Sequence, residues 1–231
     1  MFSVSPSIDP AISEIAPGFR ALSVVLQAAP LIHPEVAEKA LRQACLAANN
    51  DDFPWADAHL SAWADAFKRF GAKPKRTPCS AEALRKRVSR DGNLPALDPV
   101  VDLYNAISIK YALPVGGENF TAYTSQPRLK VADGTERFDT VKEGEIIFES
   151  PEAGEVIWCD DKGVTCRRWN WRQGVRTRLD AHAQQMWFIL ESLPAMPLEA
   201  LHRAGDELIH GLEQMMPGVQ INKQLIGFDI V

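Results

Sequence analysis

The sequence predicts an α+β fold, with helices in the first half of the chain, a strand-rich second half and a closing helix. Up to about residue 110, apolar side chains recur mainly at helical spacing. Beyond Ala112, short pieces rich in β-branched and aromatic residues alternate with turn residues. Because the two kinds of element are segregated along the chain, an α+β arrangement is favoured over an alternating parallel sheet. The 231 residues, 46% of them hydrophobic, are enough for one domain with a full core.

The first half is expected to contain one strand and four helices. An apolar run with β-branched residues predicts a strand within residues 18–29. Apolar spacing predicts helices over residues 33–48, 55–70, 80–90 and 97–109. Their ends carry boundary signals: Pro34 in the first turn, Gly71 as a C-cap, Ser80 as an N-cap, and the turn Asp91-Gly92-Asn93.

The second half is expected to be a set of short strands. They are predicted at residues 129–131, 146–148, 155–159, 164–168 and 185–190. Two dipeptides fit hairpin turns, Asp133-Gly134 and Lys162-Gly163. An amphipathic helix over residues 197–216 and a last strand over residues 219–231 complete the expected order.

Composition excludes several classes of protein. No apolar run approaches the ~20 residues of a membrane span, so no membrane association is expected. The N-terminus shows no secretory signal, and we therefore expect a cytoplasmic protein. The four cysteines are scattered with no CxxC pair and no histidine at ligand spacing, so neither a metal nor another cofactor is predicted.

Basic residues are concentrated although the net charge is -5. Such asymmetry indicates an anionic partner, whereas the overall negative charge argues against indiscriminate nucleic-acid binding, and no DNA is expected. The alternative is a solvated face of ordinary surface charges. The predicted RNA-binding residues are Lys73, Lys75, Arg76, Arg85, Lys86, Arg87 and Arg90.

Two stretches, residues 94–120 and 154–179, resemble the B3/B4 domain, the tRNA-binding and editing module of the phenylalanyl-tRNA synthetase beta subunit. The first stretch has a small-residue loop before a helix with a Val-Val-Asp segment and an asparagine, then a proline-containing turn into a strand. The second has a strand ending in acidic residues. The matching residues of the first stretch are Pro99, Val100, Val101, Asp102, Asn105 and Pro114.

The resemblance covers about residues 80–193 and implies a core there, with a helical extension at residues 1–79 and a helix and strand at residues 194–231. The chain also departs from the family pattern. The turn at residues 114–118 lacks the histidine that lies near the editing pocket of the synthetases. Their glycine-rich loop is replaced by residues 167–173, and a late glutamate of the domain is matched by Glu191.

The segment at residues 167–173 has the composition of a binding site for a polar ligand with a planar part. Arginine offers a fork for carboxylate or phosphate and a face that stacks on rings. If the segment is a strand, the two indoles of Trp169 and Trp171 share one face and the polar side chains the other. The alternative is that the tryptophans are core and the arginines are ion-paired with Asp160, Asp161 or Glu118. The residues predicted to bind a ligand here are Arg167, Arg168, Trp169, Asn170, Arg172 and Gln173.

Two further places are expected to line the same pocket. Asn105 and Ser108 are three apart on one helical face, and Gly116-Gly117 permits close backbone approach to a ligand. A local role remains the alternative for both, as a backbone hydrogen bond for Asn105 or an ordinary turn for the glycines.

The resemblance implies an RNA-binding protein that holds the aminoacylated 3′ end of tRNA, with hydrolysis of a mischarged ester in trans as its possible activity. No nucleophile or metal constellation is visible, and Glu191 is the weak catalytic candidate. A positioned water can nevertheless suffice for so activated an ester. Two alternatives stay open: a non-catalytic module for a free amino acid or related metabolite, and a hydrolase or transferase of a non-RNA amino-acid derivative.

Overall fold

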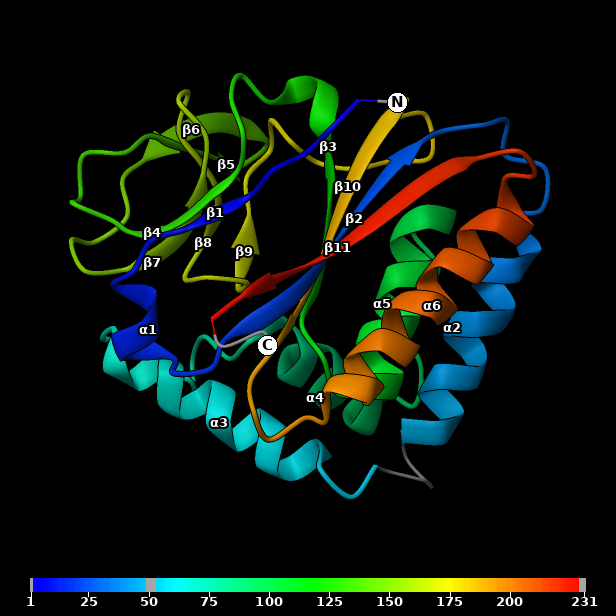
Figure 1. The fold of residues 1–231 in the computed structure, drawn as a ribbon, viewed down its shortest axis with the longest axis horizontal. Coiled ribbons are helices and arrows are strands. Elements are labelled where there is room, and N and C mark those ends of the chain that lie inside the picture. The colour runs from blue at the N-terminus through cyan, green and yellow to red at the C-terminus, as the bar shows by residue number, and fades with distance from the viewer. Residues whose placement is uncertain (1, 49–52, 229–231) are drawn as a thin grey trace.

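The computed structural model describes residues 2–48 and 53–228, and it confirms the α+β class. A four-stranded sheet with the order β11-β2-β10-β3 divides the molecule, with α2 (Glu35–Ala48), α5 (Pro99–Tyr111) and α6 (Leu198–Met215) on one side and a larger sheet on the other (Figure 1). The larger sheet has the order β1-β4-β7-β8-β5-β6, and β9 pairs with β8.

The helices are α1 (Ile12–Ile15), α2 (Glu35–Ala48), α3 (Ala56–Arg69), α4 (Ser80–Asp91), α5 (Pro99–Tyr111) and α6 (Leu198–Met215), with a 3-10 turn at Phe120–Ala122. The smaller sheet consists of β2 (Arg20–Gln27), β3 (Val115–Asn119), β10 (Gln185–Ser192) and β11 (Gln220–Gly227). The larger one consists of β1 (Ser7–Ile8), β4 (Arg128–Val131), β5 (Phe138–Lys142), β6 (Glu145–Glu149), β7 (Val156–Cys159), β8 (Val164–Arg167) and β9 (Arg172–Gln173).

Strand β10 connects the two main cores because successive side chains of a strand point to opposite faces. Phe188 and Leu190 join the core under α2, α5 and α6. Trp187 and Ile189 join a second core, which includes residues of β7, of α3 and of the turn after β8. The strand is buried on both faces, so its sequence is almost continuously apolar.

Local signals account for the position of α5. The Asp98 carboxylate caps the helix by accepting hydrogen bonds from the backbone nitrogens of Val100 and Val101 at 2.9 and 3.3 Å. Pro99 occupies the first turn, where its missing N–H is not needed. The helix ends at Ala112, whose φ of 45° lies in the left-handed region, and β3 then follows at the sheet edge.

Several predicted elements are confirmed and four local predictions are wrong. The helix at residues 80–91 begins with Ser80 as its first residue, and Cys79 is the N-cap. Asp133-Gly134 does not close a hairpin, because β4 pairs with β1 and β7 rather than with β5. Residues 115–119 form a strand instead of a turn. Residues 168–171 form a turn that interrupts the expected strand. Residues 229–231 of the predicted last strand lie outside the described residues.

No helix of the described residues is long and apolar enough to cross a bilayer.

Candidate functional site

A cavity of about 280 Å³ lies where four elements meet beside the edge strand β3. Its walls are β3, the first turns of α4, the middle of α5 and the turn after β8. The cavity also exposes Ile189 and Glu191 of β10. Its lining residues are Ser80, Ala83, Leu84, Tyr104, Asn105, Val115, Gly116, Gly117, Glu118, Trp158, Cys166, Trp169, Asn170, Trp171, Gln173, Ile189 and Glu191.

Glu191 is a buried carboxyl group in the cavity wall. One oxygen, Oε1, accepts hydrogen bonds from the indole Nε1 atoms of Trp158 and Trp169 at 2.9 and 2.8 Å. The other, Oε2, accepts one from Asn170 Nδ2 at 2.9 Å. Burial raises the pKa of Glu191 to about 7, although the three donors act in the opposite direction. The group therefore titrates near neutral pH.

Glu118 is the second buried carboxyl group in the lining. Its Oε2 accepts a hydrogen bond from the Tyr123 hydroxyl group. Burial raises the pKa of Glu118 to about 7, against the effects of hydrogen bonds and of the Arg176 charge. On β3, Glu118 pairs with Trp187 of β10, and Gly116 pairs with Ile189. Glu118 and Glu191 thus contribute to one cavity from adjacent strands.

The charge of this cavity is negative or neutral. In the part of the chain that the structure describes, no Lys, Arg or His side chain lines it. Ser80 Oγ is buried, and no described residue gives it a hydrogen-bond partner. Indole and phenol rings of Tyr104, Trp158 and Trp169 supply apolar walls. The arrangement suits a ligand with a cationic or hydrogen-bonding end next to an apolar part.

The turn between β8 and β9 has unusual backbone geometry. Arg168 and Trp169 have φ values of 47° and 65°, in the left-handed region that non-glycine residues rarely adopt. The Trp169 side chain is fully buried and packs edge-on against Phe19 and Trp63, with ring centroids 5.1 Å apart in each case. Such strain is concentrated at functional sites in many proteins.

Glu155 holds this turn in place. Its Oε1 and Oε2 atoms accept hydrogen bonds from Arg167 Nε and Nη2 at 3.0 and 2.9 Å. Oε1 also accepts from the backbone nitrogen of Arg168 at 2.9 Å. In addition, the Trp169 backbone nitrogen donates to the Val156 carbonyl group at 2.6 Å. The turn is therefore fixed by contacts with the segment that precedes and begins β7.

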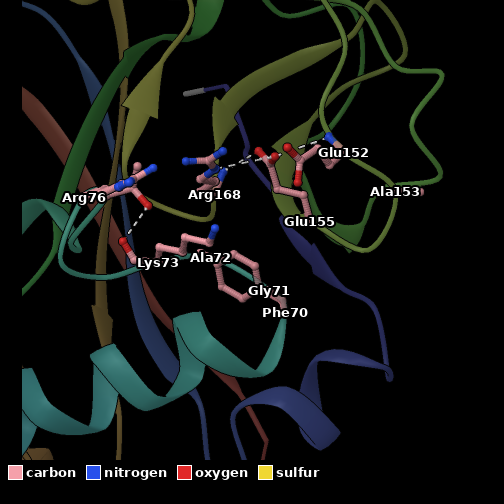
Figure 2. A pocket seen from close by; sticks show the side chains of 10 residues that line it. Phe70, Gly71, Ala72, Lys73, Arg76, Glu152, Ala153, Glu155 and Arg168 are labelled. Atoms are coloured by element: carbon pink, nitrogen blue, oxygen red, sulfur yellow. Dashed lines mark hydrogen bonds and ion pairs between the residues drawn. The ribbon is translucent and has the colours of Figure 1, made fainter.

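A second cavity, of about 270 Å³, contains the side chain of Arg168. Figure 2 shows Lys73, Arg76 and Arg168 gathered on one side of it, with Glu152 and Glu155 on the other. Phe70, at the end of α3, also lines it. This cavity is rich in positive charge, whereas the first is lined by carboxyl groups.

The other residues of the predicted basic cluster lie on or near α4, which forms one wall of the first cavity. Arg87 is four residues after the lining residue Ala83, and hence on the same helical face one turn further along. Some of the charge is compensated locally: Lys86 pairs with Glu82, and Arg87 and Arg90 pair with Asp91. The Arg85 guanidinium donates to the Ile109 carbonyl at the end of α5, and Lys75 is exposed.

Residues from three of the predicted stretches meet at the first cavity. Six of the residues predicted to bind a ligand are in its lining: Asn105, Gly116, Gly117, Trp169, Asn170 and Gln173. Their role in ligand binding remains a prediction. Gln173 Nε2 donates to the Gly117 carbonyl oxygen at 2.9 Å and ties the end of the turn to the edge strand.

Four predicted ligand residues lie elsewhere. The hydroxyl group of Ser108 is buried and donates to the Leu113 carbonyl at 2.7 Å. Arg167 pairs with Glu155 and with Glu149, so its fork is already occupied. Arg168 belongs to the second cavity, and Arg172 is exposed, with its Cζ 5.9 Å from the Trp171 ring centroid.

Three residues that line the cavity were not predicted as site residues: Glu118, Tyr104 and Trp158. Glu118 was expected in the turn at residues 114–118 and as one possible ion-pair partner of the arginines, whereas Tyr104 and Trp158 were not among the predicted ligand residues. The sequence did contain one signal for Glu118: an acidic residue stands directly after the glycine pair Gly116-Gly117 and shortly before an aromatic residue, Phe120. Trp158 could not be identified, because its indole faces Glu191 from another sheet.

Two comparisons relate the chain to known proteins. The B3/4 domain family matches residues 62–203, which is more than half of the 231 residues. A crystal structure of an N-terminal fragment of the phenylalanyl-tRNA synthetase beta-subunit from Pyrococcus horikoshii is similar with a TM-score of 0.48 and 12% sequence identity. The similarity covers 98% of this chain and 55% of that one, so the chain spans about half its length. No curated protein sequence matches the chain. On the family match, the chain belongs to the B3/4 domain family.

Proposed function

We propose that this protein binds the aminoacylated 3′ end of cytoplasmic tRNA and that the cavity beside β3 receives the amino-acid part. Membership of the B3/4 family, which the sequence resemblance connects with a tRNA-editing module, suggests the RNA partner. The observation that carries the proposal is the pair of buried carboxyl groups, Glu118 and Glu191, in a cavity with aromatic walls.

The charge of the cavity favours an ester over a free amino acid. A free amino acid brings a carboxylate, and no cation lines the cavity among residues 2–48 and 53–228. Burial of an unpaired carboxylate next to two other carboxyl groups is costly. An aminoacyl ester has lost that charge and retains an α-ammonium group, which carboxylates and aromatic faces attract. The non-catalytic amino-acid module is therefore the weaker alternative.

Ester hydrolysis is a second candidate function, and the position of Glu118 favours it. This carboxyl group lines the cavity and has a pKa of about 7. A group with a pKa near the working pH is suited to take a proton from a water molecule that attacks the ester carbonyl. The proton later passes to the leaving ribose oxygen, and the carboxyl group returns to its starting state.

The test is a panel of correctly charged and mischarged aminoacyl-tRNAs. We expect saturable binding to at least one mischarged member, and no measurable binding of the corresponding free amino acid at the same concentration. If hydrolysis occurs, Glu118→Gln should lower the single-turnover deacylation rate by about 100-fold or more. Glu145→Gln, an exposed change on β6, serves as the matched control and should leave the rate unchanged.

The outcomes separate the hypotheses. Tighter binding of the free amino acid than of any aminoacyl-tRNA contradicts the ester proposal. Binding without deacylation by the wild-type protein removes the catalytic candidate and leaves recognition alone.

A further inference from the structure

The basic cavity beside the turn of Arg168 has the chemistry of an anion site. Lys73 and Arg76 lie in the connector after α3, and Arg168 comes from the turn after β8. The three side chains converge on one side of the cavity although almost 100 residues of sequence separate the connector from the turn (Figure 2). Nothing in the chemistry of the first cavity requires this convergence.

Two of these cations, Lys73 and Arg76, are available to bind an anion. Lys73 and Arg76 are exposed, and no ion pair with another described residue involves either side chain. Glu155 lines the cavity, but Arg167 already neutralises it through two hydrogen bonds, and Arg168 lies 3.8 Å away from it. Glu152 is the other carboxylate. The positive charge therefore exceeds the negative charge around the cavity.

The two cavities share the strained turn. Two adjacent residues of this turn line different cavities. Arg168 lines the basic cavity, and Trp169 lines the cavity with the carboxyl groups. Phe70 of the basic cavity approaches Trp169, with ring centroids 6.4 Å apart. A ligand that fills both cavities thus combines an anionic part with an amine-bearing apolar part.

We propose that the basic cavity binds a phosphodiester of the RNA strand immediately upstream of the aminoacylated ribose. This inference rests on the proposed function, since the aminoacyl group in the first cavity brings that strand to the turn. Lys73 and Arg76 contact the phosphate oxygens, and Arg168 adds its planar fork. The strand passes over the turn, with the phosphate on one side and the amino acid on the other.

The test uses small hydrolysis-resistant probes. The first is an adenosine with an amino acid attached through a 3′ amide, which carries no phosphate. The second extends it by a 5′ cytidine through a phosphodiester, and the third has a neutral methylphosphonate in the same place. We expect wild-type protein to bind the phosphodiester probe about tenfold more tightly than the methylphosphonate probe. The affinity for the phosphodiester probe should also fall as salt rises.

The double variant Lys73→Ala/Arg76→Ala should lose this preference and bind the phosphate-free probe as wild type does. The matched control, Arg42→Ala/Lys142→Ala, removes the same charge at exposed positions on α2 and β5 and should retain the preference. Equal affinity of wild type for the two dinucleotide probes, or a preference that survives in the double variant, overturns the phosphate site alone. Failure of all three probes to bind contradicts the proposed function itself.

Discussion

At the scale of residues, Arg168 and Trp169 in the turn after β8 adopt an unfavourable backbone conformation that places their side chains in two different cavities. Arg168 and Trp169 both have positive φ, although neither has the short polar side chain or missing Cβ that makes this region accessible. Each such residue costs of order 1–2 kcal/mol relative to a right-handed conformation. The turn persists because Glu155, the Val156 carbonyl and the packing of the Trp169 ring hold it.

Replacement of Arg168 by asparagine should therefore stabilise the fold. Asparagine tolerates the left-handed region, and the lost ion pair with Glu155 spans 3.8 Å, so it contributes little. We expect Arg168→Asn to increase the free energy of unfolding by up to about 1 kcal/mol in urea titrations while it weakens binding to aminoacyl-tRNA.

Glu143 provides the control for that substitution. Its φ is 53° in the two-residue connection between β5 and β6, where asparagine before Gly144 suits a tight hairpin turn. Glu143→Asn should give a similar gain in stability with no change in RNA binding. A marked loss of stability in Arg168→Asn alone would mean that the arginine side chain contributes more than the backbone strain costs.

At the scale of elements, Gly117 of β3 determines how closely α5 approaches the edge of the sheet. A Cβ atom on Gly117 would lie 2.8 Å from Leu179, 2.9 Å from Tyr104 and 3.0 Å from Phe188. These three side chains come from a loop, a helix and a strand, and no single movement relieves all three contacts. Gly116 is different, because a Cβ there meets only Ile189, at 3.5 Å.

Gly117→Ala should consequently destabilise the protein by about 1–3 kcal/mol, as overpacking of a filled core does. Gly116→Ala should be nearly neutral, since its added methyl group makes only an ordinary contact. Thermal melting and urea unfolding of both variants provide the measurement. Equal stability of the two variants would show that α5 and β3 can separate freely, and that close approach does not shape the cavity.

The same elements indicate which parts of the fold the sequence can predict. The helix of Pro99–Tyr111 was predictable because a proline, a capping aspartate and helical spacing all agree locally. Strand β3 was not, since Val-Gly-Gly-Glu-Asn has little β propensity and depends on its partner β10. The turn at residues 168–171 was not predictable for a similar reason. Contacts with Glu155 and Phe19, which are distant in the sequence, override the local preference for a strand.

For the whole molecule, the sequence predicted which segments would lie together but not which ionisable groups would line the cavity between them. Segments around Asn105, Gly117 and Trp169, which the family resemblance relates despite their separation in the sequence, line one cavity. The arginines nearby suggested an anionic ligand end in that cavity. Arg167 instead pairs with Glu155, which is distant in the sequence, and does not line the cavity. Glu118 and Glu191 are the carboxyl groups that do.

The two buried carboxyl groups make a prediction about pH and global stability. Burial raises the pKa of Glu118 and of Glu191 to about 7, well above the ordinary glutamate value of 4.5. Between these values the folded protein binds more protons than the unfolded chain, so their contribution to stability is present at low pH and is lost as the pH rises toward 7. The loss should be on the order of 1–3 kcal/mol per group.

Glu118→Gln and Glu191→Gln should each reduce this loss, because glutamine does not ionise. Urea unfolding of the wild type and both variants at pH 5 and pH 7.5 measures the change in the free energy of unfolding with pH. The prediction concerns how much this change differs between the proteins. Asp160 beside Arg176 has a lowered pKa, so it stays ionised throughout this pH range in every variant and does not contribute to the difference. Exposed Glu145→Gln should follow the wild type. If all four proteins respond alike to pH, both glutamates are ionised in the folded state and the cavity is more hydrated than its burial indicates.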